Sequence, residues 1–83
     1  MTPDQIRIAR SVLGSLWGFG RPLHMSELGR ALRLKGRDPG EMVKKWEAGA
    51  PVSGPASVAI EMWLAGAKPP DGFDQIRSQR LRT

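Results

Sequence analysis

The sequence contains no cysteine, so neither a disulfide nor a thiolate metal site can stabilise the fold. Its one histidine, His24, has no second imidazole with which to share a metal ion. No apolar run approaches the ~20 residues that a membrane-spanning helix needs, and no signal peptide precedes the first expected helix. We therefore expect a cytoplasmic chain outside the membrane, with no metal, no cofactor and no small-molecule ligand.

Length and charge narrow the class of protein further. Eighty-three residues allow one domain, because a chain this short can bury only a single core. A hydrophobic content of 40% with three tryptophans is typical of a folded chain. The net charge of +5 favours a polyanionic partner only weakly, because a basic surface can also be inert and solvated.

Helix signals recur along the chain, and strand patterns do not. Thr2 caps a first helix that is predicted from Pro3 to about Trp17, with Pro3 at its first position. Ser26 is the predicted cap of a second helix. That helix carries its apolar and polar residues on opposite sides. The apolar side holds Leu28, Ala31 and Leu32, and the polar side holds Glu27, Arg30 and Arg33.

Two more helices follow. For the third, the sequence predicts Asp38 at the cap, Pro39 at the first position and Glu41 in a capping box. Its apolar stripe is Met42, Val43 and Trp46, and Gly49 is predicted to close it. The fourth begins at the Ser53 cap and ends at Gly66. Its apolar side is broad, which predicts burial either in the monomer core or against a second copy. The residues are Val58, Ala59, Met62 and Trp63, with Ile60 and Leu64 widening this side.

Short helices joined by compact turns predict an all-α fold, a small orthogonal bundle of four to five helices. We place the domain at residues 1–73, with Phe73 folding back onto the core. Residues 74–83 are expected to form a basic tail that is frayed or briefly helical.

Catalysis finds little support in the sequence. His24 has no partner, no nucleophile motif surrounds any serine, and Ser26 and Ser53 are better explained as helix caps. The carboxylates are scattered, and Asp38 and Glu41 already have a structural role at a helix start. We therefore expect that the chain is not an enzyme.

The positive charge is concentrated around one break between helices. Six cations fall within sixteen residues, opposed by two carboxylates; they are Arg30, Arg33, Lys35, Arg37, Lys44 and Lys45. In a helix-turn-helix, the second helix enters the major groove by its N-terminal end while the first crosses the backbone. A basic turn leading into a well-capped helix suits that geometry. The alternative is that these cations are ordinary solvated residues on two surface helices.

Four ordered segments resemble the Cro/repressor-type (Xre-like) transcriptional regulators. The opening residues 1–14 are similar to the start of many such proteins, and Ser26–Leu32 resembles the first helix of their helix-turn-helix. Val43–Gly49, with its Trp46-Glu47 pair, resembles the end of their recognition helix, and Val52–Ile60 the helix after it.

The resemblance implies a lambda-repressor-like fold and a set of DNA contacts. Base-facing positions would be Asp38, Gly40, Glu41 and Lys44, with phosphate contacts at Lys45 and Ser26. The chain departs from the family in the longer and more basic turn of residues 34–38, whose cations Lys35 and Arg37 we add to the interface. Residues 17–24 are also expanded, and the short Gly40 and acidic Glu41 stand where the family often carries longer polar or basic side chains.

The leading hypothesis is a sequence-specific DNA-binding regulator, a repressor that binds a two-fold operator as a homodimer. One copy has too small an interface for tight specific binding, and two copies join two half-sites. The DNA-binding residues would be Ser26, Arg30, Lys35, Arg37, Asp38, Gly40, Glu41, Lys44 and Lys45. The fourth helix, with Trp63 and Phe73, would form the dimer surface or else close the monomer core. The alternative function is a protein-interaction module, an antiactivator or assembly factor, which the enlarged turn between the helices would suit.

Overall fold

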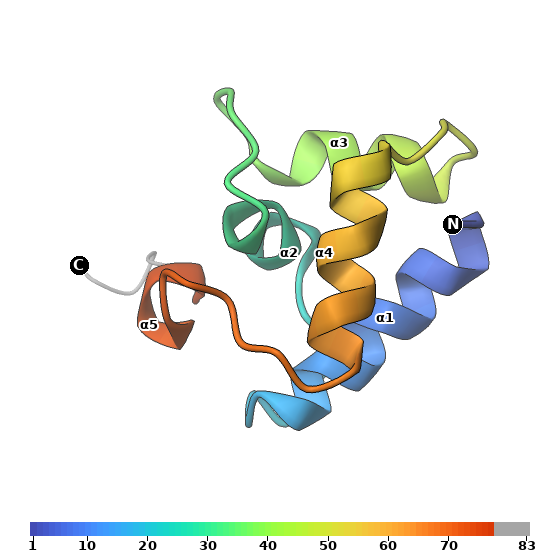
Figure 1. The fold of residues 1–83 in the computed structure, drawn as a ribbon. Coiled ribbons are helices and arrows are strands. Elements are labelled where there is room, and N and C mark those ends of the chain that lie inside the picture. Colours follow the sequence, from blue (N-terminus) through green and yellow to red (C-terminus); the bar gives the residue numbers. More distant parts are fainter. Residues whose placement is uncertain (78–83) are drawn as a thin grey trace.

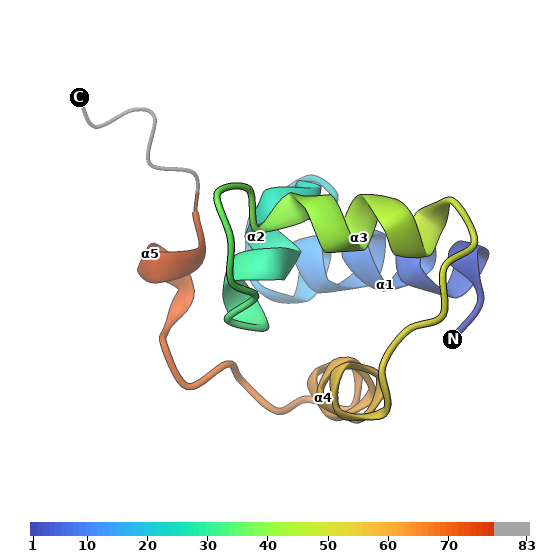
Figure 2. The ribbon, with the colours of Figure 1, turned by 90° about the horizontal axis from the view of Figure 1, so that it is seen from above.

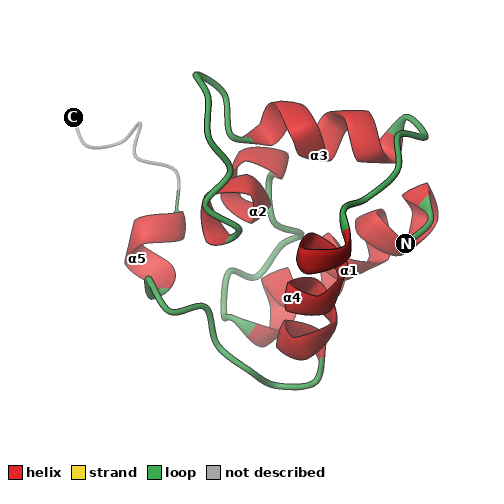
Figure 3. Cartoon of the chain, turned by 45° about the horizontal axis from the view of Figure 1, so that its top comes forward, coloured by secondary structure: helices red, strands yellow, loops and turns green. Residues whose placement is uncertain are grey.

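The computed structural model describes residues 1–77. Within this range the chain forms five helices and no strand, which confirms the all-α prediction (Figures 1 and 3). The helices are α1 (Pro3–Leu16), α2 (Met25–Ala31), α3 (Gly40–Glu47), α4 (Gly54–Leu64) and α5 (Phe73–Ile76). None of them, over residues 1–77, has the length and apolar character that crossing a membrane would require.

The ends of α1 agree closely with the prediction. The Thr2 hydroxyl accepts a hydrogen bond from the Gln5 backbone N–H at 3.1 Å. The Gln5 side-chain oxygen in turn accepts from the Thr2 backbone N–H at 2.8 Å, which completes a capping box. The helix ends at Leu16, and Trp17 is its C-cap. One face is buried through Ile6, Ala9 and Leu13, at helical spacing.

The start of α2 corrects the prediction, because the N-cap is His24 and not Ser26. The cause is Glu27, whose carboxylate accepts a hydrogen bond from the His24 backbone N–H at 2.7 Å and so fixes the first turn two residues earlier. Glu27 is fully buried, although the sequence placed it on the polar side of the helix. Ser26 is a half-buried residue in the first turn.

The start of α3 also differs from the prediction. Pro39 is the N-cap, and no side chain caps the helix in the expected manner. Asp38 lies one position earlier, and its carboxylate accepts a hydrogen bond from the Gly40 N–H at 2.9 Å. Such a local turn competes with the capping box, and the Glu41 side chain is left exposed. Gly49 follows the C-cap with φ of 116° and closes the helix as expected.

The cap of α4 is Ser53, as predicted, and its hydroxyl accepts from the Ala56 N–H at 3.3 Å. The apolar side was predicted correctly for Ile60 and Trp63 and wrongly for Val58 and Met62. The buried residues are Ala56, Ile60 and Trp63, whereas Val58 is 56% exposed and Met62 57% exposed. The bundle buries the face centred on Ile60, which leaves Val58 and Met62 on the outside.

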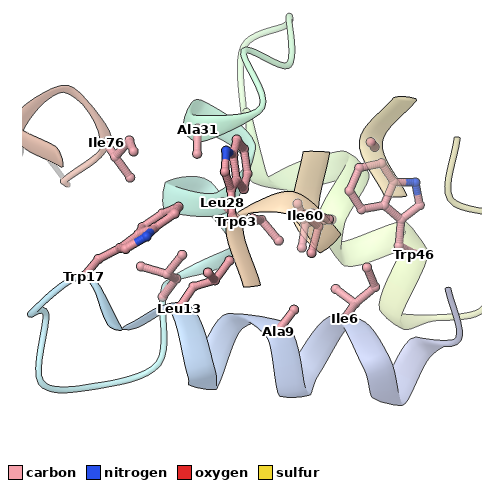
Figure 4. Packing of buried hydrophobic residues seen from close by; sticks show 13 residues of the cluster. Ile6, Ala9, Leu13, Trp17, Leu28, Ala31, Trp46, Ile60, Trp63 and Ile76 are labelled. Carbon is pink, nitrogen blue, oxygen red and sulfur yellow. The ribbon is translucent and has the colours of Figure 1, made fainter. Parts of the chain in front are cut away.

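The core lies where α1, α2, α3 and α4 meet (Figure 4). Leu13, Leu28 and Ile60 are fully buried there. The rings of Trp17 and Trp63 meet edge to face, with centroids 5.6 Å apart. In Figure 2, α4 is seen end-on while α1 and α3 run across the view.

The C-terminal part of the described chain packs beside α2 (Figures 1 and 2). Phe73 folds back onto the core as expected, with its ring centroid 5.3 Å from that of Trp17. Ile76 is fully buried in the same cluster. The expected boundary between residues 73 and 74 thus falls inside α5, and residues 78–83 of the expected tail lie outside the described residues. Because Trp63 is 6% exposed and Phe73 half-buried, both close the core of the monomer.

Candidate nucleic-acid interface

The α2–α3 pair is held together at backbone contact distance. A Cβ atom added at Gly29 would collide with the carbonyl of Pro39, immediately before α3. A Cβ atom added at Gly40 would lie 2.8 Å from the backbone nitrogen of Ser26, in the first turn of α2. The two glycines therefore fix how closely the start of α3 approaches α2.

The inner face of α3 is held by apolar packing. Val43 is fully buried and Trp46 is 3% exposed, both within the core cluster. The spacing of residues 43, 46 and 47 places all three on one side of the helix.

Glu47 adds a nearly buried ion pair to that same face. Its carboxylate accepts hydrogen bonds from Arg10 Nε at 2.7 Å and from Arg10 Nη2 at 3.0 Å. Arg10 Nη1 also donates to the Leu23 carbonyl at 2.8 Å. Arg7 Nη2 donates to the backbone carbonyl of Glu47 at 3.2 Å, so two arginines of α1 hold the end of α3. Sequence reasoning missed this pair, although Val43, Trp46 and Glu47 share one face and could have indicated burial.

A second ion pair fixes the start of α2. Arg21 Nη1 and Nη2 each donate to the Glu27 carboxylate at 2.8 Å. Burial by itself raises the pKa of Glu27, but the hydrogen bonds from Arg21 and from the His24 N–H, with the charge of Arg21, lower this pKa to about 2. Glu27 is therefore ionised at neutral pH despite its burial.

The outer face of α3 carries charges of a different kind. Glu41, Lys44 and Lys45 are exposed, and no ion pair joins them to any residue in the range 1–77. Met42 lies on this face too, 43% exposed, although its place in the predicted apolar stripe implied burial. The helix thus presents three charged side chains and one apolar side chain to solvent.

The turn before α3 extends this surface. Lys35, Gly36, Arg37 and Asp38 are all exposed, and the chain reverses at Gly36 with φ of 114°. A hollow of about 380 Å³ separates the turn from the first turn of α3, where Glu41 and Met42 line it.

A shallow groove of about 490 Å³ lies between the starts of α2 and α3. It brings together several of the predicted DNA-binding residues, namely Ser26, Asp38, Gly40 and Lys44. Arg10 and His24 also line it. Gly40 is buried against the backbone of α2. It has no side chain with which to contact DNA, and its role is to let the two helices approach closely.

Arg30 is the predicted site residue that the structure places elsewhere. Its Nε donates a hydrogen bond to the Ile76 carbonyl at 2.9 Å, which ties α2 to α5. Arg33, beside it in the basic segment, forms two hydrogen bonds to the Asp71 carboxylate at 2.8 and 2.6 Å. The hydrogen bonds from Arg33 lower the pKa of Asp71. These two arginines connect α2 to the C-terminal segment, and the remaining cations of the cluster lie on the turn and on α3.

The resulting surface has four cations, Lys35, Arg37, Lys44 and Lys45, and two carboxylates, Asp38 and Glu41. Asp38 is already engaged with the backbone of Gly40. Chemically, the arrangement can bind phosphate oxygens through its cations and accept one hydrogen bond through Glu41. Within residues 1–77, no three His, Asp or Glu side chains gather in a group that could hold a metal ion.

Comparison with models of protein families, with curated proteins and with solved structures gives no match for this chain.

Proposed function

We propose that the chain is a DNA-binding regulator of the Cro/repressor type, in which α2 and α3 form a helix-turn-helix within a small orthogonal bundle. The observation that carries this proposal is the division of α3 into two faces. Val43, Trp46 and Glu47 fix the helix to the core, while Lys44 and Lys45 remain exposed and unpaired within the described residues. A helix that enters a DNA groove needs both a rigid inner face and a free outer one.

In the proposed complex, α3 lies in the major groove with its first turn toward the bases. The Glu41 carboxylate can accept a hydrogen bond from cytosine N4, and Met42 can contact a thymine methyl group. Lys44 and Ser26 line the groove between the helix starts and are placed to bind one phosphate of the backbone. Lys35, Arg37 and Lys45 supply further positive charge beside it.

The proposed protein binds a two-fold operator as a homodimer and acts as a repressor. Since Trp63 and Phe73 pack in the monomer core, the apolar side chains that α4 offers to a second copy are Val58 and Met62. Two copies would double the number of phosphate contacts and read two half-sites.

A protein-interaction module is the second candidate, and one observation favours it. Ile8, Val12 and Leu16 form an exposed apolar stripe along α1, at spacings of four residues and with exposures of 60, 40 and 57%. Such a stripe suits contact with the apolar face of a partner helix.

The two functions differ in their dependence on salt. Fluorescence anisotropy of a labelled random duplex DNA should show binding that weakens steeply as salt rises, because phosphate contacts release counterions. Reversing the charge of both Lys44 and Lys45 to Glu should abolish this binding while the circular dichroism spectrum stays unchanged. Lys68→Glu, away from the surface, changes the charge by the same amount as Lys44→Glu alone. It should retain most of the binding, whereas Lys44→Glu alone should weaken it. Absence of binding at low salt would leave the interaction module as the better account.

A further inference from the structure

A second groove, of about 470 Å³, lies between the segment that follows α2 and one side of α4. Its walls are mainly apolar, and the side chains that matter most are Leu32, Leu34, Ala59, Met62 and Trp63. This volume falls within the range of about 300–1,000 Å³ that is typical of small-molecule sites.

The charges around this groove have one sign. Arg33 and Lys68 line it, and no Asp or Glu does. Arg33 is already engaged by the Asp71 carboxylate through two hydrogen bonds. Lys68 is exposed and forms no ion pair within the range 1–77, so its charge stands uncompensated beside apolar surface.

We propose that this groove binds a small amphipathic carboxylate with an aliphatic chain. The chain would pack against Leu34, Ala59 and Met62, where water now covers apolar surface. The carboxylate would lie at the ammonium group of Lys68, at the solvent-exposed rim. The sequence predicted no small-molecule ligand because the walls come from three separated segments, residues 31–34, 53–63 and 67–70, which no local pattern connects.

Titration of the full chain, without DNA, tests the site directly. Octanoate, 1-heptanol and heptyltrimethylammonium share a heptyl chain and differ in head group. We expect saturable shifts of the methyl resonances of Leu34, Ala59 and Met62 with octanoate, and an affinity about two- to fivefold above that of heptanol, as suits an exposed charge pair. The ammonium compound should bind most weakly. Equal affinities for all three would contradict the charge assignment, and shifts confined to other residues would overturn the site.

Variants separate the head-group contact from the apolar contact. Lys68→Gln should reduce the affinity for octanoate to that for heptanol, while Lys45→Gln, with the same loss of charge on α3, should leave octanoate binding unchanged. Ala59→Leu fills the groove and should weaken both ligands equally. Met62→Gln, at an exposed position, gives the same test without disturbing the core. Unchanged octanoate binding in both of these variants would show that the ligand does not occupy the groove.

Discussion

The inner face of α3 pairs its charge with another helix, whereas the outer face leaves its charges exposed to solvent. On the inner face, Glu47 is nearly buried, and Arg10 approaches it with two nitrogens at 2.7 and 3.0 Å. On the outer face, Lys44 and Lys45 stand exposed with no ion pair in the range 1–77. The planar guanidinium fits a carboxylate with fixed geometry, whereas a lysine ammonium is a compact and mobile charge.

The same division holds beyond α3. Arg10, Arg21 and Arg33 each bind one carboxylate through two nitrogens. These pairs join α1 to α3, the turn after α1 to α2, and the end of α2 to the C-terminal segment. None of the ion pairs recorded in residues 1–77 involves a lysine. Arg10, Arg21 and Arg33 thus stabilise the fold, whereas Lys44 and Lys45, together with Arg37 and Lys35 of the exposed turn, are left for external contacts. The predictions below test whether the two classes of charge separate stability from binding.

The largest effect is expected on removal of Glu47. Glu47→Ala leaves Arg10, whose side chain is 18% exposed, without its partner, and should lower the free energy of unfolding by about 3 kcal/mol. Urea unfolding followed by tryptophan fluorescence measures it. The double variant Arg10→Met/Glu47→Ala should recover part of the loss, because no unpaired charge then remains. A double variant less stable than the sum of the single changes would argue against the ion pair as the cause.

The next effect concerns the contact between α2 and α3. Gly29→Ala places a methyl group against the Pro39 carbonyl and should cost about 2 kcal/mol of stability, since the two backbones must move apart. Gly54→Ala is the matched control, because a Cβ atom there meets nothing within 4 Å. We expect the control to change the melting temperature little. Equal effects of the two substitutions would mean that the close approach of the helices is not needed.

Acid should reveal the buried pair of Glu27 with Arg21. The folded-state pKa of Glu27 is lowered from 4.5 to about 2, so the unfolded chain binds the proton more readily. The stability that this carboxylate contributes is therefore complete above about pH 4.5 and is lost as the pH falls toward about 2. Because other carboxylates titrate in the same range, the measurement is the difference in unfolding free energy between the wild type and Glu27→Gln at several pH values. That difference should shrink with acid, and a constant difference would contradict the assignment.

The smallest effect on stability is expected on the outer face of α3. Lys44→Gln should change the unfolding free energy by no more than about 0.5 kcal/mol, as is usual for an exposed position. It should nevertheless weaken DNA binding and reduce the slope of log affinity against log salt by about 1, because one phosphate contact is lost. Lys68→Gln serves as the control with the same change in charge. If Lys44→Gln destabilised the fold as much as Glu47→Ala does, the outer face of α3 would not be free of structural contacts as stated.

Local signals predicted much of the fold. The capping box at Thr2, the serine cap of α4 and the closing glycine of α3 depend on neighbouring residues, and the structure shows all three. Helix starts were misplaced where a buried or local contact decided them. The hydrogen bond from the His24 N–H to Glu27 makes α2 begin directly after His24. The hydrogen bond from the Gly40 N–H to Asp38 forms a local turn in place of the expected cap of α3.

The position of the candidate site was predictable from the sequence. Which of its charged residues are free, and which pair within the bundle, was not. Sequence reasoning gathered Arg30 and Lys44 into one basic cluster, yet Arg30 donates to the Ile76 carbonyl, 46 residues along the chain. Pairing over such distances depends on the assembled bundle, and no local pattern encodes it. The same holds for Glu47, whose partner Arg10 lies 37 residues away. Met42 was assigned to the core because helical periodicity places it beside Val43. Periodicity alone does not show which edge of the apolar stripe the neighbouring helices cover.

In the proposed complex, the outer face of α3 and the turn before it contact DNA. Backbone amide chemical shifts recorded during titration with a short duplex test this contact best, since they report each residue in turn. We expect saturable changes at Ser26, at residues 35–38 and at residues 41–45, with Ile8 and Val12 unaffected. Changes along the exposed stripe of α1, or no change at the lowest salt at which the protein stays folded, would contradict it.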